Sequence, residues 1–189
     1  MARLKNWNPE RKRQQILDAA IWILSRKLYY QCPISEIAKR ARVAKGTVYL
    51  YFSSKEELYF SIIFMLMDKM KEFVQSMTED KILPSKRLFV LLEKQSAFME
   101  KHRNIFLAIR QNVKSHKEKY LNILDKKLGE FVETITNIIN DGIKQGEFKN
   151  YPASSVALLF LSLMFANMHR KMNIHTKIVD VYVSPKLLW

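Results

Sequence analysis

Apolar side chains recur at intervals of three and four residues along most of this chain, and this spacing places them on one face of an α-helix. Asn8 and Pro9 form a helix start signal, because asparagine caps free N–H groups and proline is tolerated in the first turn. The apolar residues that follow predict a first helix over residues 9–27. Two shorter apolar patterns, over 34–41 and 43–52, predict two short helices joined by a tight turn.

Longer helical patterns fill most of the remaining chain. Ser54 and Glu57 have the spacing of a capping box, and they predict a helix from Lys55 to about residue 77. Further helices are predicted from residue 84, over 105–111, over 116–145 with Gly146 as the terminating glycine, and over 153–171. The last segment, 173–189, mixes β-branched residues with a proline, and its pattern does not define a structure.

Composition narrows the fold class. Four glycines and five prolines in 189 residues are too few for a sandwich or barrel of short strands, so the predicted fold class is all-α. An apolar fraction of 48% excludes a disordered chain. The net charge of +14 favours a polyanionic partner, either nucleic acid or an anionic membrane surface. Residues 1–60 hold 12 Lys/Arg against 5 Asp/Glu, so the first third is about twice as basic per residue as the rest.

Compartment and catalytic chemistry can also be read from the sequence. Cys32 is the one cysteine, which excludes an intrachain disulfide and favours a reducing, cytoplasmic compartment. The N-terminus lacks the apolar region of a signal peptide, and the longest apolar run, 156–168, is too short to span a bilayer. The four histidines lack the spacing of a zinc site, and the sequence has no phosphate loop or nucleophile motif. We therefore expect no enzyme, metal, cofactor or membrane partner.

The segment 34–58 carries the most informative pattern. Its apolar positions, including Val48 and Phe52, would anchor the second short helix on its neighbours. Its exposed positions would carry side chains suited to DNA, namely Lys45, Thr47, Tyr49, Tyr51 and Lys55. Lysine and tyrosine reach phosphate oxygens, and threonine offers a hydroxyl to phosphate and a methyl group to thymine. Gly46 would permit close approach of a DNA backbone.

The run from Ala44 to Tyr59, AKGTVYLYFSSKEELY, closely resembles the hallmark DNA-binding motif of the TetR family of transcriptional regulators. The resemblance is strong over residues 9–66 and weaker over 142–148. It implies a homodimer in which a three-helix helix-turn-helix domain, residues 1–55, binds double-stranded DNA. A C-terminal helical domain, residues 56–189, would bind the ligand and dimerise. The implied function is a sequence-specific transcriptional regulator, a repressor that binds a palindromic operator and is released by a small apolar effector.

Carried over residue by residue, the resemblance assigns eight DNA-binding residues. Four fall where family members touch bases or the adjoining backbone: Lys45, Gly46, Thr47 and Tyr49. Two fall at phosphate-contacting positions: Tyr51 and Lys55. Ser35 lies at the start of the second helix, whose dipole favours a phosphate, and Arg42 lies beside the groove within reach of another.

Four positions depart from the family's pattern. Leu28 and Arg42 each stand where a glycine is usual, and a left-handed Arg42 would cost about 1 kcal/mol relative to glycine. Pro33 and Ala44 replace the serine or threonine that commonly caps the two helices of the motif. These departures concern the stability of helix ends more than DNA binding.

The second part of the chain, residues 60–172, is rich in Met and Phe, which line adaptable apolar pockets and also fill ordinary cores. The predicted ligand pocket takes six of them: Phe64, Met67, Phe98, Phe106, Phe131 and Phe165. The helix over 153–171 is apolar nearly all round and includes small residues, which favours a dimer interface. Its predicted interface residues are Leu159, Leu163 and Ala166.

Two other classes stay open from the sequence. One is a DNA-binding protein of the same fold that answers to a protein partner or to nothing, which a solid C-terminal core would favour. The other is a basic peripheral membrane protein, which would bind liposomes, and Tyr49→Ala would not change that binding.

Overall fold

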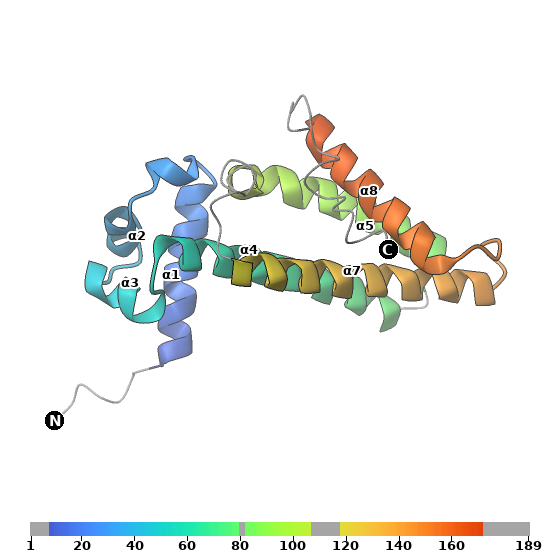
Figure 1. The fold of residues 1–189 in the computed structure, drawn as a ribbon, viewed down its shortest axis with the longest axis horizontal. Coiled ribbons are helices and arrows are strands. Elements are labelled where there is room, and N and C mark those ends of the chain that lie inside the picture. Colours follow the sequence, from blue (N-terminus) through green and yellow to red (C-terminus); the bar gives the residue numbers. More distant parts are fainter. Residues whose placement is uncertain (1–7, 80–81, 107–117, 172–189) are drawn as a thin grey trace.

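The structure, a computed structural model, describes residues 8–79, 82–106 and 118–171, and every regular element in these ranges is a helix (Figure 1). The all-α prediction is confirmed. Of the short helix predicted over 105–111, residues 105 and 106 are helical, whereas 107–111 and the C-terminal tail from 172 lie outside the described residues. Among the helices described, none is both long and apolar enough to cross a membrane.

The N-terminal unit consists of three helices, α1 (Pro9–Leu24), α2 (Ile34–Arg40) and α3 (Lys45–Tyr51). Asn8 caps α1, because its Oδ1 accepts a hydrogen bond from the Arg11 N–H at 3.0 Å. The helix ends at Leu24, three residues before its predicted end. The chain leaves the helical path there because Leu28 is extended and a short 3-10 helix, η1 (Tyr29–Gln31), follows.

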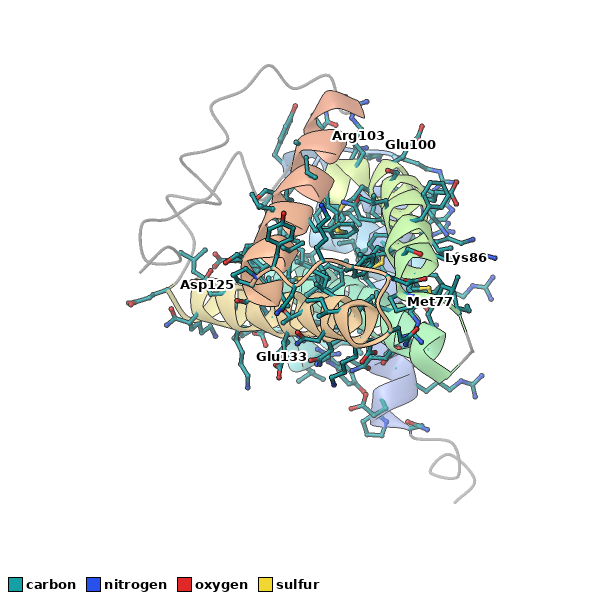
Figure 2. The ribbon with its side chains drawn as sticks, turned by 90° about the vertical axis from the view of Figure 1, so that its right-hand side faces the viewer. Met77, Lys86, Glu100, Arg103, Asp125 and Glu133 are labelled. Carbon is teal, nitrogen blue, oxygen red and sulfur yellow. The ribbon has the colours of Figure 1, made fainter. Side chains whose placement is uncertain are left out.

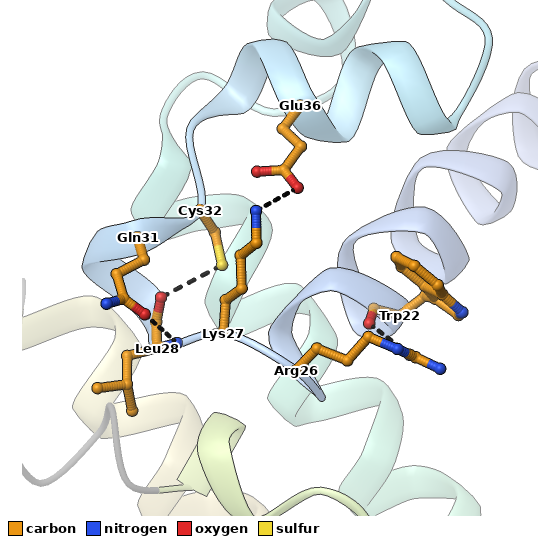
Figure 3. A network of polar contacts seen from close by, with 7 residues as sticks. All are labelled: Trp22, Arg26, Lys27, Leu28, Gln31, Cys32 and Glu36. Carbon is orange, nitrogen blue, oxygen red and sulfur yellow. Dashed lines mark hydrogen bonds and ion pairs between the residues drawn. The ribbon is translucent and has the colours of Figure 1, made fainter.

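Polar contacts fix the connection between α1 and α2 (Figure 3). The Leu28 N–H donates to Gln31 Oε1 at 3.2 Å, and the Cys32 thiol donates to the Leu28 carbonyl at 3.2 Å. Lys27 forms an ion pair with Glu36 on α2 at 2.6 Å. With a φ of −71°, Leu28 is comfortable in this turn, so the glycine expected from the family's pattern is not needed.

The turn between α2 and α3 is a Schellman motif. The Val43 N–H donates to the Ala38 carbonyl at 3.0 Å, and the Arg42 N–H donates to the Lys39 carbonyl at 3.2 Å. Arg42 has a φ of 52°, in the left-handed region that the family's usual glycine at this position favours. No side-chain hydrogen bond caps α2 at Pro33 or α3 at Ala44, as predicted from the loss of the usual serine or threonine.

We expect Arg42→Gly to raise the free energy of unfolding by about 1 kcal/mol, because glycine adopts a left-handed conformation without strain. Urea unfolding followed by circular dichroism measures the change. Lys39→Gly is the matched control: it replaces an exposed basic residue inside α2 and should lower the free energy of unfolding by about 1 kcal/mol. Destabilisation by Arg42→Gly would contradict the strain argument.

In its described residues, the larger unit contains four long helices: α4 (Lys55–Glu79), α5 (Pro84–Lys101), α7 (Glu118–Lys144) and α8 (Ala153–Lys171). Helix α4 runs beside α7, while α5 and α8 lie together on the opposite side (Figure 1). Charged residues such as Lys86 on α5 and Glu133 on α7 lie on the outer surface, and apolar side chains fill the space between the helices (Figure 2).

The end of α7 needs two glycines. Gly146 has a φ of 76° and ends the helix, with its N–H donating to the Ile143 carbonyl at 3.1 Å. A Cβ atom on Gly142 would lie 2.2 Å from the Phe148 ring, so only glycine leaves room for that ring to pack back on the helix. The terminating glycine predicted at 146 is therefore confirmed.

The described residues form two apolar cores. The first lies among the three N-terminal helices and the first half of α4, and Ile105 and Tyr120 from the larger unit also join it. The second lies among the far half of α4, α5, α7 and α8. Because α4 contributes to both, a movement of this helix reaches both units.

Candidate nucleic-acid interface and cavity

Helix α3 is anchored from one side and open on the other. Val48 and Phe52 are buried in the first core. Lys45 and Gly46 are exposed at the start of the helix, and Tyr49 is 45% exposed. These residues share a face because they recur at intervals of three and four. The structure thus presents three of the predicted base-reading residues together on an outward surface, whereas Thr47 beside them is half-buried.

Sequence reasoning missed Leu50, which is 80% exposed on α3. It lies four residues after Gly46 and next to Tyr49, so helical periodicity alone could have placed it on the open face. An apolar side chain on this face can contact the C5-methyl group of thymine.

Tyr51 does not lie as predicted. Its hydroxyl is buried without a hydrogen-bond partner among the described residues, and its ring packs against the first core. The reason is the helical period: Tyr51 is three residues after Val48, so both lie on the inner side of α3. In this conformation the Tyr51 hydroxyl does not face outward toward a phosphate.

Lys55 is held by the protein itself. Its Nζ donates to the Tyr29 carbonyl at 2.6 Å and lies 4.2 Å from the centre of the Tyr29 ring. Burial lowers the pKa of Lys55 below its usual value. The contact ties the start of α4 to η1, which the sequence did not predict. A phosphate contact by Lys55 would need this bond to be exchanged, and it stays a prediction.

The start of α4 departs in one detail from the predicted capping box. Ser54 Oγ accepts from the Glu57 N–H at 3.0 Å, as expected. The Glu57 carboxylate, however, reaches one residue further back, to the N–H of Ser53 at 2.9 Å and to the Ser53 hydroxyl. These hydrogen bonds lower the pKa of Glu57. They restrain Ser53 and Ser54, two of the three residues between α3 and α4, and so tie the end of α3 to the start of the long helix.

The remaining predicted contacts flank α3. Ser35, in the first turn of α2, and Arg42, in the turn before α3, are both exposed. Arg13 lies over the Phe52 ring at 5.1 Å from its centre, which brings a further cation from α1 to the base of α3. These three residues add one hydroxyl group and two cations to the helical unit that carries α3.

We expect Gly46→Ala to weaken DNA binding without destabilising the fold. A Cβ atom on Gly46 would meet nothing within 4 Å, so the fold does not require glycine there, and alanine should raise the free energy of unfolding by about 0.5 kcal/mol. DNA affinity should fall about tenfold if the helix backbone closely approaches the DNA. Fluorescence anisotropy and urea unfolding measure the two effects. Gly129→Ala on α7, which is equally free of neighbours, should leave DNA affinity unchanged.

A cavity lies between the helices of the larger unit. The cavity is partly open, and the space between its lining atoms is about 820 Å³ when the solvent at its mouth is included. Five of the six predicted pocket residues line its wall: Met67, Phe98, Phe106, Phe131 and Phe165. Phe64 is not among the lining residues, because its ring packs toward the first core, 5.8 Å from the Phe60 ring. The cavity also argues against the solid C-terminal core that a regulator without a ligand would favour.

Two ion pairs connect α4 and α7 beside the cavity. Lys71 pairs with Glu130 at 2.7 Å, and Lys127 pairs with Asp68. All four side chains line the cavity, and each is partly exposed. The cavity thus combines an apolar interior with a charged border on its α4–α7 side.

Helix α8 carries an exposed apolar stripe. Leu159 and Leu163 are 66% and 65% exposed, and Ala166 is also exposed. Ser155 and Ser162 continue the same stripe, because these positions recur at intervals of three and four. All three predicted interface residues therefore lie on one surface that the described part of the chain leaves uncovered.

A helix-turn-helix with an open second helix, joined to a helical domain with an apolar cavity, defines the class of DNA-binding regulators. Residues 16–62 match the family model described as bacterial regulatory proteins, tetR family. The chain is 32% identical over 152 residues to the fatty acid metabolism regulator protein of Bacillus subtilis, covering 73% of this chain and 71% of that protein. The chain belongs to the tetR family, and it is a DNA-binding transcriptional regulator that acts as a dimer.

Solved structures agree with this assignment. A transcriptional regulator FadR from Bacillus subtilis, in complex with stearoyl-CoA, is 25% identical, with a TM-score of 0.66 over 85% of this chain and 87% of that one. The fatty acid degradation regulator FadR from Bacillus halodurans is 22% identical and shares the fold, with a TM-score of 0.69 over 89% and 87% of the two chains.

Proposed function

We propose that this protein represses genes of fatty acid metabolism and is released from its operator by a long-chain acyl-CoA. The observation that carries the proposal is the cavity, whose interior of Met, Phe and Leu side chains matches an acyl chain. The partly exposed ion pairs beside it suit a polar carrier that stays near solvent. Two of the matches also support an acyl-CoA effector: one is named as a regulator of fatty acid metabolism, and the other was solved in complex with stearoyl-CoA.

The proposed mode of DNA binding is based on the exposed face of α3. Residues 1–55 form the DNA-binding domain, and residues 56–189 form the effector-binding and dimerisation domain. A symmetric dimer places two α3 helices in successive major grooves of a palindromic operator, about 34–36 Å apart. Within each half-site, Lys45, Gly46, Thr47 and Tyr49 approach the bases, while Ser35 and Arg42 approach phosphates.

Release requires that a ligand in the cavity changes the position of α3. Phe106 lines the cavity, and its neighbours contact the DNA-binding domain directly. The Asn104 side chain donates to the Ser25 carbonyl at the end of α1 at 3.3 Å, and the Tyr59 hydroxyl of α4 donates to the Ile105 carbonyl. A ligand that displaces residues 104–106 therefore pulls on α1 and on the first turns of α4. A coupling of about 1–3 kcal/mol is sufficient to release DNA.

Fluorescence anisotropy on the promoter DNA upstream of the protein's own gene tests the function. We expect specific binding that weakens steeply between about 50 and 200 mM salt, because phosphate contacts release counterions. Dodecanoyl-CoA should then release the DNA, whereas CoA alone should not. Specific DNA binding that dodecanoyl-CoA leaves unchanged would refute the proposed effector, and binding that barely depends on salt would refute the DNA interface.

A further inference from the structure

A buried amide lies in the wall of the cavity on its α5 side. Gln95 is only 2% exposed, and it is surrounded by apolar side chains that include Phe98 and Met164. The other polar residues that line this cavity, on α4 and α7, are partly exposed and paired with one another. Gln95 is therefore the fully buried polar group of the described wall.

The orientation of the Gln95 amide is fixed by its neighbour. Its Nε2 donates to the Met164 carbonyl on α8 at 3.4 Å. A carbonyl can only accept, so the amide nitrogen must face it and the oxygen must point elsewhere. Among the described residues, no atom donates a hydrogen bond to Gln95 Oε1. A buried acceptor without a donor destabilises a protein, and such a group in a native structure calls for an explanation.

We propose that Gln95 is a specificity-determining residue, whose Oε1 accepts a hydrogen bond from a donor on the effector. This inference rests on the proposed function, because it takes the cavity as the effector site. It implies an effector that is not purely apolar where it meets α5. In an acyl thioester of CoA, the donor nearest the acyl chain is the amide N–H of the carrier arm. A hydroxyl group on the acyl chain is the other source of the same chemistry.

Simple packing does not account for Gln95. Leucine or methionine would fill a similar volume in this wall without leaving an acceptor unpaired. An effector that supplies the donor removes the unpaired acceptor when it binds, whereas an effector that lacks it leaves the acceptor buried and unpaired. The site should therefore discriminate between two ligands that differ only in this donor.

Three thioesters of matched length test the inference by isothermal titration calorimetry on the full-length protein. S-dodecanoyl-N-acetylcysteamine carries the amide N–H, S-pentyl dodecanethioate carries no donor, and S-pentyl 3-hydroxydodecanethioate carries a hydroxyl. We expect wild type to bind one of the two donor-bearing probes about tenfold more tightly than the donor-free probe. The preferred probe identifies whether the donor is the amide or the hydroxyl.

The variant Gln95→Met should bind all three probes within about twofold of one another, because it keeps the apolar wall and removes the acceptor. Gln75→Leu, an exposed glutamine on α4, is the matched control and should keep the wild-type preference. Equal binding of the three probes by wild type overturns the inference but leaves the effector site intact. If neither these probes nor dodecanoyl-CoA binds, the proposed effector site fails, and the inference fails with it. The wild-type comparison holds even if Gln95→Met does not fold.

Discussion

Tyr49→Ala and Lys45→Ala should each weaken binding to operator DNA by about 10- to 100-fold, and the double variant should lose most of its sequence preference. Both side chains are exposed on α3, so their removal should change the free energy of unfolding by less than about 0.5 kcal/mol. The effect on binding is large because a base contact contributes about 1–3 kcal/mol of discrimination. Fluorescence anisotropy on operator and scrambled DNA measures both affinity and preference.

The two single variants should change DNA binding in different ways. If Lys45 contacts a phosphate, its loss should weaken binding to operator and scrambled DNA alike. The slope of the logarithm of the binding constant against the logarithm of the salt concentration should then become shallower by about 1. If Tyr49 contacts a base, its loss should affect the operator more than scrambled DNA. Tyr30→Ala is the matched control, because Tyr30 is an exposed tyrosine on η1, which precedes α2 and α3 in the chain. Wild-type affinity in the double variant would mean that α3 does not enter the groove.

Most of the fold could be predicted from the sequence because long amphipathic helices have a strong periodic signal. The predicted start of α5, the glycine at the end of α7 and the whole of α8 agree with the structure. The end of α1 was predicted three residues too late, because the fold there depends on contacts of Leu28 with Gln31 and Cys32 rather than on periodicity.

The site was harder to predict where a side chain's role depends on distant residues. Lys55 donates a hydrogen bond to the carbonyl of Tyr29, 26 residues earlier, and no local sequence pattern predicts that contact. The inward position of Tyr51 could have been predicted, since it follows Val48 by three residues. Gln95 also had a signal, because it falls between Leu91 and Phe98 on the apolar face of its helix, where a polar residue needs a reason.

Replacing Leu159 and Leu163 together by glutamate should convert the dimer into a monomer and lower operator affinity at least a hundredfold. Both leucines lie exposed on the α8 stripe, so each single chain should still fold, with little change in its circular dichroism spectrum. Four glutamates facing one another across a two-fold axis would be buried without partners, which strongly opposes association. The loss of affinity follows because two linked half-site contacts exceed one by about 10²–10⁴.

Sedimentation velocity measures the mass of the assembly, and anisotropy measures its affinity for the same operator. The matched control replaces Leu83 and Phe89 by glutamate. Both are exposed apolar residues of another helix, since Leu83 is the N-cap of α5 and Phe89 lies within it. This control should remain dimeric and bind DNA like wild type. A dimeric α8 variant would show that the stripe is not the interface, and a monomeric α5 control would move the interface to that helix. Because α8 packs on α7, and α7 on α4, an interface on α8 would also hold the two α3 helices at the spacing that the operator requires.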